Sequence, residues 1–203
     1  MATGPLKSAG LVVCLERKDF LMSSIGIACG RFQIFHNEHL RYVMAAWEKC
    51  DHLIVGITSP DPETAPVEAE DTNRSEEAAN PCTYYERFKM IEGVLLEQGL
   101  SRDDFDIVPY PIGKPELIKY YVPKGATHYV TILDRWGHRK NSRLREMGYD
   151  VEVLWDDKPK GISSTMLREK IAAGQDWSQY VPAATYRFIT ENDIHKRIAE
   201  MMK

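Results

Sequence analysis

The sequence predicts an α/β fold: a doubly wound parallel sheet of about five strands, with helices on both faces. Two observations predict it. Short apolar runs rich in β-branched residues recur along the chain, and a segment of helical periodicity follows each of them. Strict alternation of strand and helix is typical of parallel strands joined by crossover helices.

The predicted elements follow one another in regular order. The strands are expected at residues 25–29, 53–58, 105–110, 129–133 and 151–155. The helices are expected at residues 40–50, 84–97, 116–122, 142–147 and 164–173. Thr83 and Glu86 form a capping-box pair at the start of the second helix. Pro182 lies near the first turn of a C-terminal helical extension over residues 180–202.

The chain is expected to fold as one domain. Its 203 residues suffice for one well-packed α/β domain and are too few for two large ones. We assign residues 23–203 to this domain and residues 1–22 to a leader of uncertain order. Residues 59–80 hold three prolines and seven acidic residues against one basic residue. This composition favours a loop, and two interpretations stay open: a lid over a substrate, or a solvated surface loop.

Charge and hydropathy argue against two classes of partner. A net charge of -4 predicts that nucleic acid is not the partner. No apolar stretch reaches the length of a membrane span, so we expect no membrane partner either. The four cysteines show no Cys-x-x-Cys spacing, which is typical of reduced thiols in a cytoplasmic protein.

A turn with two histidines, Gly30 to His39, follows the first predicted strand. It leads into a helix, and the N–H groups at a helix start favour anions. His36 and His39 add donors that can follow charge as it develops on a transferring phosphoryl group. The alternative is that both histidines are surface or capping residues of an ordinary turn.

A second anion cradle is predicted far downstream, at residues 161–168. Ser163 is placed to cap a helix, so its hydroxyl and those of Ser164 and Thr165 gather at one helix start. Arg168 follows about one turn later and suits a phosphate. The alternative is a plain serine-capped helix with a solvated arginine. The functional interpretation requires the two motifs to meet in space.

Together the two motifs resemble the nucleotidyltransferase superfamily that includes adenylyl- and cytidylyltransferases. Within it the chain looks most like the archaeal-type nicotinamide-nucleotide adenylyltransferases. The resemblance covers residues 25–194 and includes residues 80–87, 148–151 and 174–182. It implies a Rossmann-like fold, in which ligands bind at the carboxyl ends of the strands where the strand order reverses.

The resemblance implies a reaction as well. A nucleoside monophosphate, AMP from ATP in the first instance, would pass to the phosphate of a nicotinamide mononucleotide-like acceptor, with release of pyrophosphate. Two alternatives stay open: a cytidylyltransferase that activates a small phosphate or phosphonate with CTP, and a nucleotide-binding sensor without turnover. The partners are then small molecules, with Mg²⁺ accompanying the triphosphate and no dedicated metal ligands in the protein. A homo-oligomer is left open.

The resemblance also assigns roles to residues of both motifs. His36, His39 and Arg168 would be catalytic. The nucleotide would be bound by Gly30, Arg31, Phe32, Gln33, Ser163, Ser164 and Thr165.

Departures from the family pattern concern the second substrate. Glu38 stands where the family has glycine, Ile34 where it has proline, and Ala79 where archaeal-type enzymes have a basic residue. A Gly-Asn-Pro-like turn after the fourth strand is replaced by residues 134–138. Trp136 is a candidate to stack on a ring, the alternative being a core or surface tryptophan. The candidate acceptor-binding residues are Lys114, Arg135, Trp136, His138 and Arg139.

Overall fold

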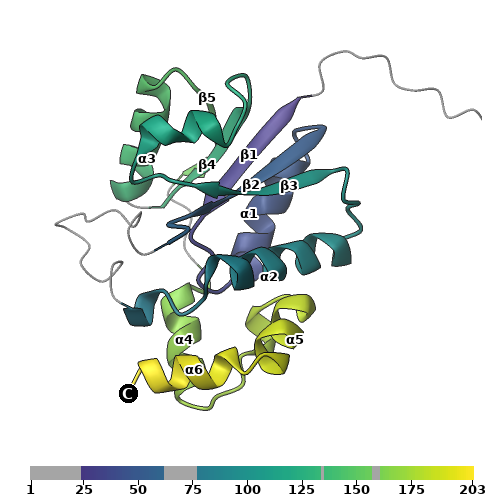
Figure 1. Ribbon diagram of the computed structural model, residues 1–203, viewed down its shortest axis with the longest axis vertical. Coiled ribbons are helices and arrows are strands. Elements are labelled where there is room, and N and C mark those ends of the chain that lie inside the picture. Colours follow the sequence, from purple (N-terminus) through teal and green to yellow (C-terminus); the bar gives the residue numbers. More distant parts are fainter. Residues whose placement is uncertain (1–23, 62–76, 134, 157–160) are drawn as a thin grey trace, which may run out of the picture.

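The computed structural model describes residues 24–61, 77–133, 135–156 and 161–203 (Figure 1). Its centre is one sheet in the order β3-β2-β1-β4-β5, and every neighbouring pair is parallel. The five strands are β1 (Ile25–Gly30), β2 (His52–Thr58), β3 (Phe105–Tyr110), β4 (Thr127–Ile132) and β5 (Asp150–Asp156). The predicted doubly wound parallel sheet is confirmed. The order reverses between β1 and β4, because the chain first builds outward through β2 and then returns to the other side of β1.

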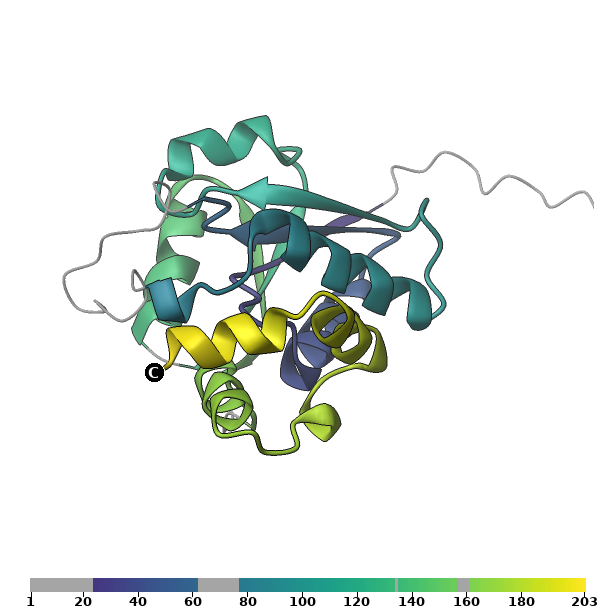
Figure 2. The same cartoon turned by 60° about the horizontal axis from the view of Figure 1, so that its bottom comes forward.

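The helices cover both faces of this sheet (Figures 1 and 2). One face carries α1 (Asn37–Trp47), α2 (Tyr84–Glu97), α4 (Ser164–Ala172), α5 (Ala183–Glu191) and α6 (Ile194–Met201). The other face carries α3 (Arg135–Glu146) and the 3₁₀ helix η4 (Pro115–Tyr120). Two further 3₁₀ turns are η3 (Glu77–Ala79) and η5 (Ser178–Tyr180).

Each face of the sheet has its own apolar core, because successive side chains of a strand point to opposite faces. In β1, Ala28 belongs to the core under α1 and α2, whereas Ile27 and Cys29 belong to the core under α3. Strands buried on both faces read as continuous apolar runs, and this is why they were predictable.

The predicted C-terminal extension consists of α5, which docks on α2, and α6, which docks on α4. The carboxylate of Glu97 accepts a hydrogen bond from the Ala184 N–H (3.0 Å) and pairs with Arg187 (3.1 Å). It therefore serves as the N-terminal cap that Pro182 does not supply. Arg197 of α6 reaches Glu86 at 2.6 Å. None of the helices in the described part of the chain combines the length and apolarity that a membrane crossing requires.

Three helices differ most from the sequence prediction. α1 begins at Asn37 rather than at residue 40, because His36 caps it. α3 begins at Arg135 rather than at residue 142, because the segment that stands in place of the family's turn is helical, with Gly137 buried. The predicted helix at 116–122 is the 3₁₀ helix η4. The leader and most of the 59–80 loop lie outside the described residues.

Candidate active site

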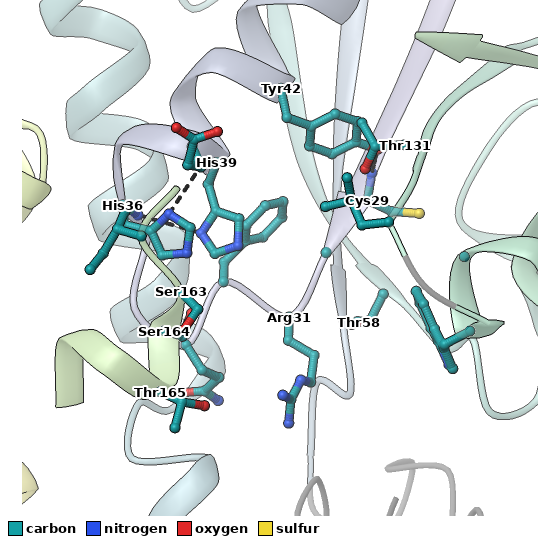
Figure 3. Close-up of a pocket in the computed structure, with 18 of the residues that line it drawn as sticks. Cys29, Arg31, His36, His39, Tyr42, Thr58, Thr131, Ser163, Ser164 and Thr165 are labelled. Atoms are coloured by element: carbon teal, nitrogen blue, oxygen red, sulfur yellow. Dashed lines mark hydrogen bonds between the residues drawn. The ribbon is translucent and has the colours of Figure 1, made fainter. Parts of the chain in front are cut away.

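A cavity of about 280 Å³ opens at the carboxyl ends of β1 and β4, where the strand order reverses. Its wall includes the Gly30–His39 turn and the start of α4, so the two motifs predicted from the sequence meet here (Figure 3). The first turns of α3 and the ends of β2 and β4 complete it. This is the place at which open parallel sheets bind ligands.

His36 and His39 cap α1 reciprocally. The His39 N–H donates to Nδ1 of His36 and the His36 N–H to Nδ1 of His39, both at 3.4 Å. The two rings stack with centroids 3.6 Å apart (Figure 3). Because each ring turns Nδ1 to the backbone, its Nε2 edge faces away from the cap. The capping alternative and the functional one are therefore compatible, since the cap fixes the orientation of both imidazoles.

The turn before the histidines holds a strained residue. Phe32 has φ 54°, in the left-handed region that side chains other than glycine seldom adopt. Its buried ring packs edge-on against His39, with centroids 5.0 Å apart. A Cβ at Gly30 would lie 2.8 Å from the Phe32 ring, so this position requires glycine. Strain held by packing in this way is typical of functional sites. Here the strained Phe32 packs against the His39 ring and holds it in position.

Gln33 and Arg168 hold the turn from behind. The Gln33 amide donates to the Cys82 carbonyl (2.9 Å) and accepts from the Cys82 N–H (2.8 Å). Arg168 donates to the Gln33 carbonyl (2.9 Å) and to the Thr165 hydroxyl (3.3 Å). It is 5% exposed and does not line the cavity, and burial lowers its pKa. Arg168 thus joins the two motifs to each other, and its direct contact with a phosphate stays a prediction.

Arg87 is a positioning residue that sequence analysis missed. Its guanidinium is 2% exposed and donates to the carbonyls of Thr83, Arg31, Thr58 and Ser59 at 2.8–3.2 Å. Burial lowers its pKa to about 10. These bonds join the end of β2 to the turn after β1. Arg87 lies in the segment 80–87, which resembles the family. Its role was not predictable, because its four carbonyl partners come from three separate segments of the chain.

The start of α4 forms the opposite side of the phosphate cradle. The Ser163 hydroxyl accepts from the Met166 N–H (3.2 Å), which confirms the predicted cap. Ser164 donates weakly to the Ile34 carbonyl (3.5 Å), and the Thr165 side chain lies at the exposed rim. Arg31 lines the same cavity from the turn after β1 (Figure 3). Histidines, hydroxyls, helix N–H groups and an arginine therefore converge on one space suited to a polyphosphate.

The far wall of the cavity carries a buried cation, Lys140. Its ammonium is 8% exposed, donates to the Cys29 carbonyl (3.2 Å) and lies 5.6 Å from the centre of the Trp136 ring. Beside it, the Tyr42 hydroxyl donates to the Tyr129 carbonyl (2.7 Å), and burial raises the Tyr42 pKa to about 12. Tyr42 is therefore neutral at physiological pH, and Lys140 contributes a positive charge to this wall.

Lys140 was not among the predicted acceptor-binding residues, although its spacing of four residues from Trp136 indicated that the two share a helix face. Residues four apart on a helix share a face, so Trp136 and Lys140 point inward together. Trp136 lines the cavity as predicted. His138 and Arg139 line a second cavity along α3, which Trp136 and Lys140 border too.

Lys114 and Arg135 line neither cavity. Lys114 precedes η4, and Arg135 is exposed at the start of α3. Lys114 was a candidate from the Gly-Lys-Pro turn, and Arg135 from the segment that replaces a Gly-Asn-Pro-like turn. That segment is the start of α3, and a helix sends successive side chains in different directions.

Glu38 brings the one carboxylate to the described cavity wall. It pairs with Arg41 at 3.8 Å and reaches the backbone of Gly161 just before α4. Among the described residues, no group of three or more His, Cys, Asp or Glu side chains is placed to hold a metal ion.

Comparisons with known proteins find similar cytidylyl- and adenylyltransferases. The sequence profile of the cytidylyltransferase-like family matches residues 27–170. The chain is 42% identical over 177 residues to the phosphonoformate cytidylyltransferase of Streptomyces viridochromogenes, covering 87% of this chain and 96% of that protein. It is 28% identical over 180 residues to the nicotinamide-nucleotide adenylyltransferase of Saccharolobus solfataricus, covering 88% and 97%.

A solved structure is similar in fold. It is a bifunctional NMN adenylyltransferase/ADP ribose pyrophosphatase from Francisella tularensis, complexed with AMP and a manganese ion. The TM-score is 0.63 at 20% identity, and the match covers 88% of this chain and 52% of that one. At this identity the likeness concerns the fold alone.

Proposed function

Since the chain belongs to the cytidylyltransferase-like family and is a nucleotidyltransferase, we propose that it transfers a cytidylyl group from CTP to a small phosphonate or phosphate acid. Pyrophosphate is the other product. The observation that carries the proposal is the meeting of the His36–His39 pair and the α4 start in one cavity. CTP is preferred to ATP as donor because the cytidylyltransferase relative is 42% identical and the adenylyltransferase relative 28%. The sequence alone had favoured the opposite order.

The donor side performs the chemistry by positioning and charge stabilisation. An ionised oxygen of the acceptor attacks the α-phosphorus of CTP, and the bond from that phosphorus to the bridging oxygen of pyrophosphate breaks. No strong general base is required, because the attacking acid is already ionised near neutral pH. His36 and His39 would stabilise the charge that develops on the α- and β-phosphates. Arg31 and the start of α4 would hold the leaving pyrophosphate.

The acceptor side favours a small acid over a nicotinamide nucleotide. The nicotinamide ring of the mononucleotide carries a positive charge. A ring stacked on Trp136 would lie next to the ammonium of Lys140, 5.6 Å from the indole centre. The ammonium would repel the positive charge of such a ring, whereas an anionic acceptor would gain a charge-assisted hydrogen bond. Lys140 therefore supports the alternative of a phosphonate or phosphate acceptor.

Magnesium would enter with the triphosphate. Mg²⁺ keeps several waters and is bound through substrate phosphates plus one or two carboxylates. The described cavity wall offers the carboxylate of Glu38 alone. Triphosphate oxygens and water would therefore supply most ligands, and the ion would neutralise charge on the leaving pyrophosphate.

Pyrophosphate release tests the proposal. The protein is incubated with Mg²⁺, each of the four NTPs in turn, and either phosphonoformate, phosphonoacetate or nicotinamide mononucleotide. We expect release with CTP and a phosphonate. Release with ATP and nicotinamide mononucleotide alone would restore the adenylyltransferase alternative. Nucleotide binding without release from any pair would support the sensor.

A further inference from the structure

Glu38 occupies an unusual position for a carboxylate. It lies between the two histidines of the cap, and its side chain spans the gap to the segment that leads into α4. A Cβ added to Gly161 would stand 2.8 Å from Oε1 of Glu38. The carboxylate therefore sits against the Gly161 backbone, at the edge of the cavity that is bounded by the starts of α1 and α4.

The charge of Glu38 limits which part of a bound ligand can lie next to it. The other ionic or imidazole side chains of the described cavity wall are Arg31, His36, His39 and Lys140, which suit phosphates and acids. A carboxylate beside a phosphate would raise the energy of the complex by like-charge repulsion. Apart from a metal ion, the ligand portion that suits this carboxylate best is neutral and offers hydrogen-bond donors.

The wall beyond Glu38 is suited to a flat ring. Trp155 and Ile162 line the cavity there. The Arg41 guanidinium, which pairs with Glu38 at 3.8 Å, lies 5.1 Å from the centre of the Trp155 ring. The order along this wall is thus anion cradle, carboxylate, aromatic surface. A nucleoside triphosphate has the same order: phosphates, a sugar with two hydroxyl donors, and a base.

We propose that Glu38 recognises the ribose of the donor nucleotide. Its carboxylate accepts a hydrogen bond from the 2′- or 3′-hydroxyl, and this makes the enzyme selective for ribonucleotides. The inference rests on the proposed function in that the donor is a nucleoside triphosphate, and it adds a residue that determines specificity for the sugar. Arg41 orients the carboxylate from the outside.

Equilibrium binding tests this role without the reaction. The affinities of CTP, 2′-deoxy-CTP and 3′-deoxy-CTP are measured by calorimetry with Mg²⁺ and no acceptor, for the wild type and for Glu38→Ala. The wild type should bind CTP about tenfold or more tighter than the analogue that lacks the contacted hydroxyl, the scale of one hydrogen bond to a charged group. Glu38→Ala should reduce that ratio to about threefold or less by weakening CTP alone.

Two further variants separate recognition from structure. Gly161→Ala leaves the Glu38 carboxylate charged and displaces it, because the new methyl group meets Oε1 of Glu38. The preference for CTP over deoxy-CTP should fall, but less than in Glu38→Ala. Glu48→Gln removes an exposed carboxylate at the other end of α1 and should leave the preference unchanged.

Three results would overturn the inference. One is an unchanged ratio of CTP to deoxy-CTP affinity in Glu38→Ala. Another is an equal loss for both nucleotides together with a higher Mg²⁺ requirement, which would make Glu38 a metal ligand. The third is a wild type that binds no nucleotide. If ATP binds and CTP does not, the same comparison is made with ATP and its deoxy analogues. The proposed function fails separately, through absent pyrophosphate release, which leaves this binding test intact.

Discussion

The two sides of the cavity are built in different ways. On the donor side, short continuous segments supply the groups: the turn from Gly30 to His39 and the start of α4. On the acceptor side the groups come from three different elements, with Thr58 at the end of β2, Thr131 on β4, and Trp136 and Lys140 on α3. The donor side is thus encoded locally, whereas the acceptor side exists only once the sheet has assembled. In the proposed function, the donor side determines the reaction class and the acceptor side determines the choice of acceptor.

Removal of a donor-side imidazole should have the largest effect. We expect His39→Ala to lower kcat by about 10²-fold or more, the scale for loss of one transition-state donor. The variant should still fold, since the lost cap costs about 1 kcal/mol. Steady-state pyrophosphate release measures the effect, and His52→Gln, on the far end of β2, is the matched control. Turnover near that of the wild type would remove His39 from the reaction.

Removal of the acceptor-side cation should act on one substrate only. Lys140→Met keeps the length of a buried side chain and deletes its charge. We expect the KM for the phosphonate acceptor to rise by about 10- to 100-fold, since a hydrogen bond to a charged group is worth about 1.5–3 kcal/mol. The affinity for CTP should change by less than about threefold. Lys49→Met, at an exposed lysine, controls for net charge. An equal loss for both substrates would contradict the division of the cavity.

Arg87 should link the two sides, because it binds the Arg31 carbonyl on one and the Thr58 carbonyl on the other. Arg87→Leu removes the side-chain donor from four backbone carbonyls, and the bonds to those of Thr58 and Ser59 are buried. We expect the free energy of unfolding to fall by about 3 kcal/mol or more, measured by urea denaturation. In the fraction that stays folded, both KM values should rise. A change confined to one substrate would show that the ends of β1 and β2 are not held as one unit.

A smaller effect concerns the pH dependence of stability, which involves a histidine in the core behind the acceptor side. His128 of β4 is 1% exposed, and its ring nitrogens have no hydrogen-bond partner among the described residues. Burial lowers its pKa to about 4. The unfolded chain binds a proton near pH 6.5, so stability should decline as pH falls from about 6.5 to 4. The difference of about 2.5 pKa units corresponds to at most about 3 kcal/mol.

His128→Phe should remove this part of the pH dependence. Thermal unfolding followed between pH 4 and 7 provides the measurement. The variant should lose less stability at low pH than the wild type, because the unfolded state no longer gains a proton at this site. Parallel curves for the two proteins would show that His128 is not buried in its neutral form.

Prediction from the sequence was more successful for the locally encoded donor side of the cavity than for the acceptor side. The bounds of α2 and β3 were predicted in full, and both phosphate-binding motifs were located, because each depends on neighbours in the chain. The start of α3 was predicted at residue 142 rather than at Arg135, because the segment stands where the family has a turn and only packing against the sheet makes it helical. Lys140 was passed over for the same reason. Arg168 was assigned to a phosphate, yet its observed bonds to Gln33 and Thr165 required knowledge of the fold.

The most direct test of the account is a crystal structure with CTP and Mg²⁺ bound. The account predicts one triphosphate gripped from both sides, with the α- and β-phosphates beside His36 and His39 and the β- and γ-phosphates at the start of α4. The ribose should face Glu38, and the side of Lys140 should be open to an acceptor. A nucleotide bound away from either motif, or bound to one of them alone, would contradict it.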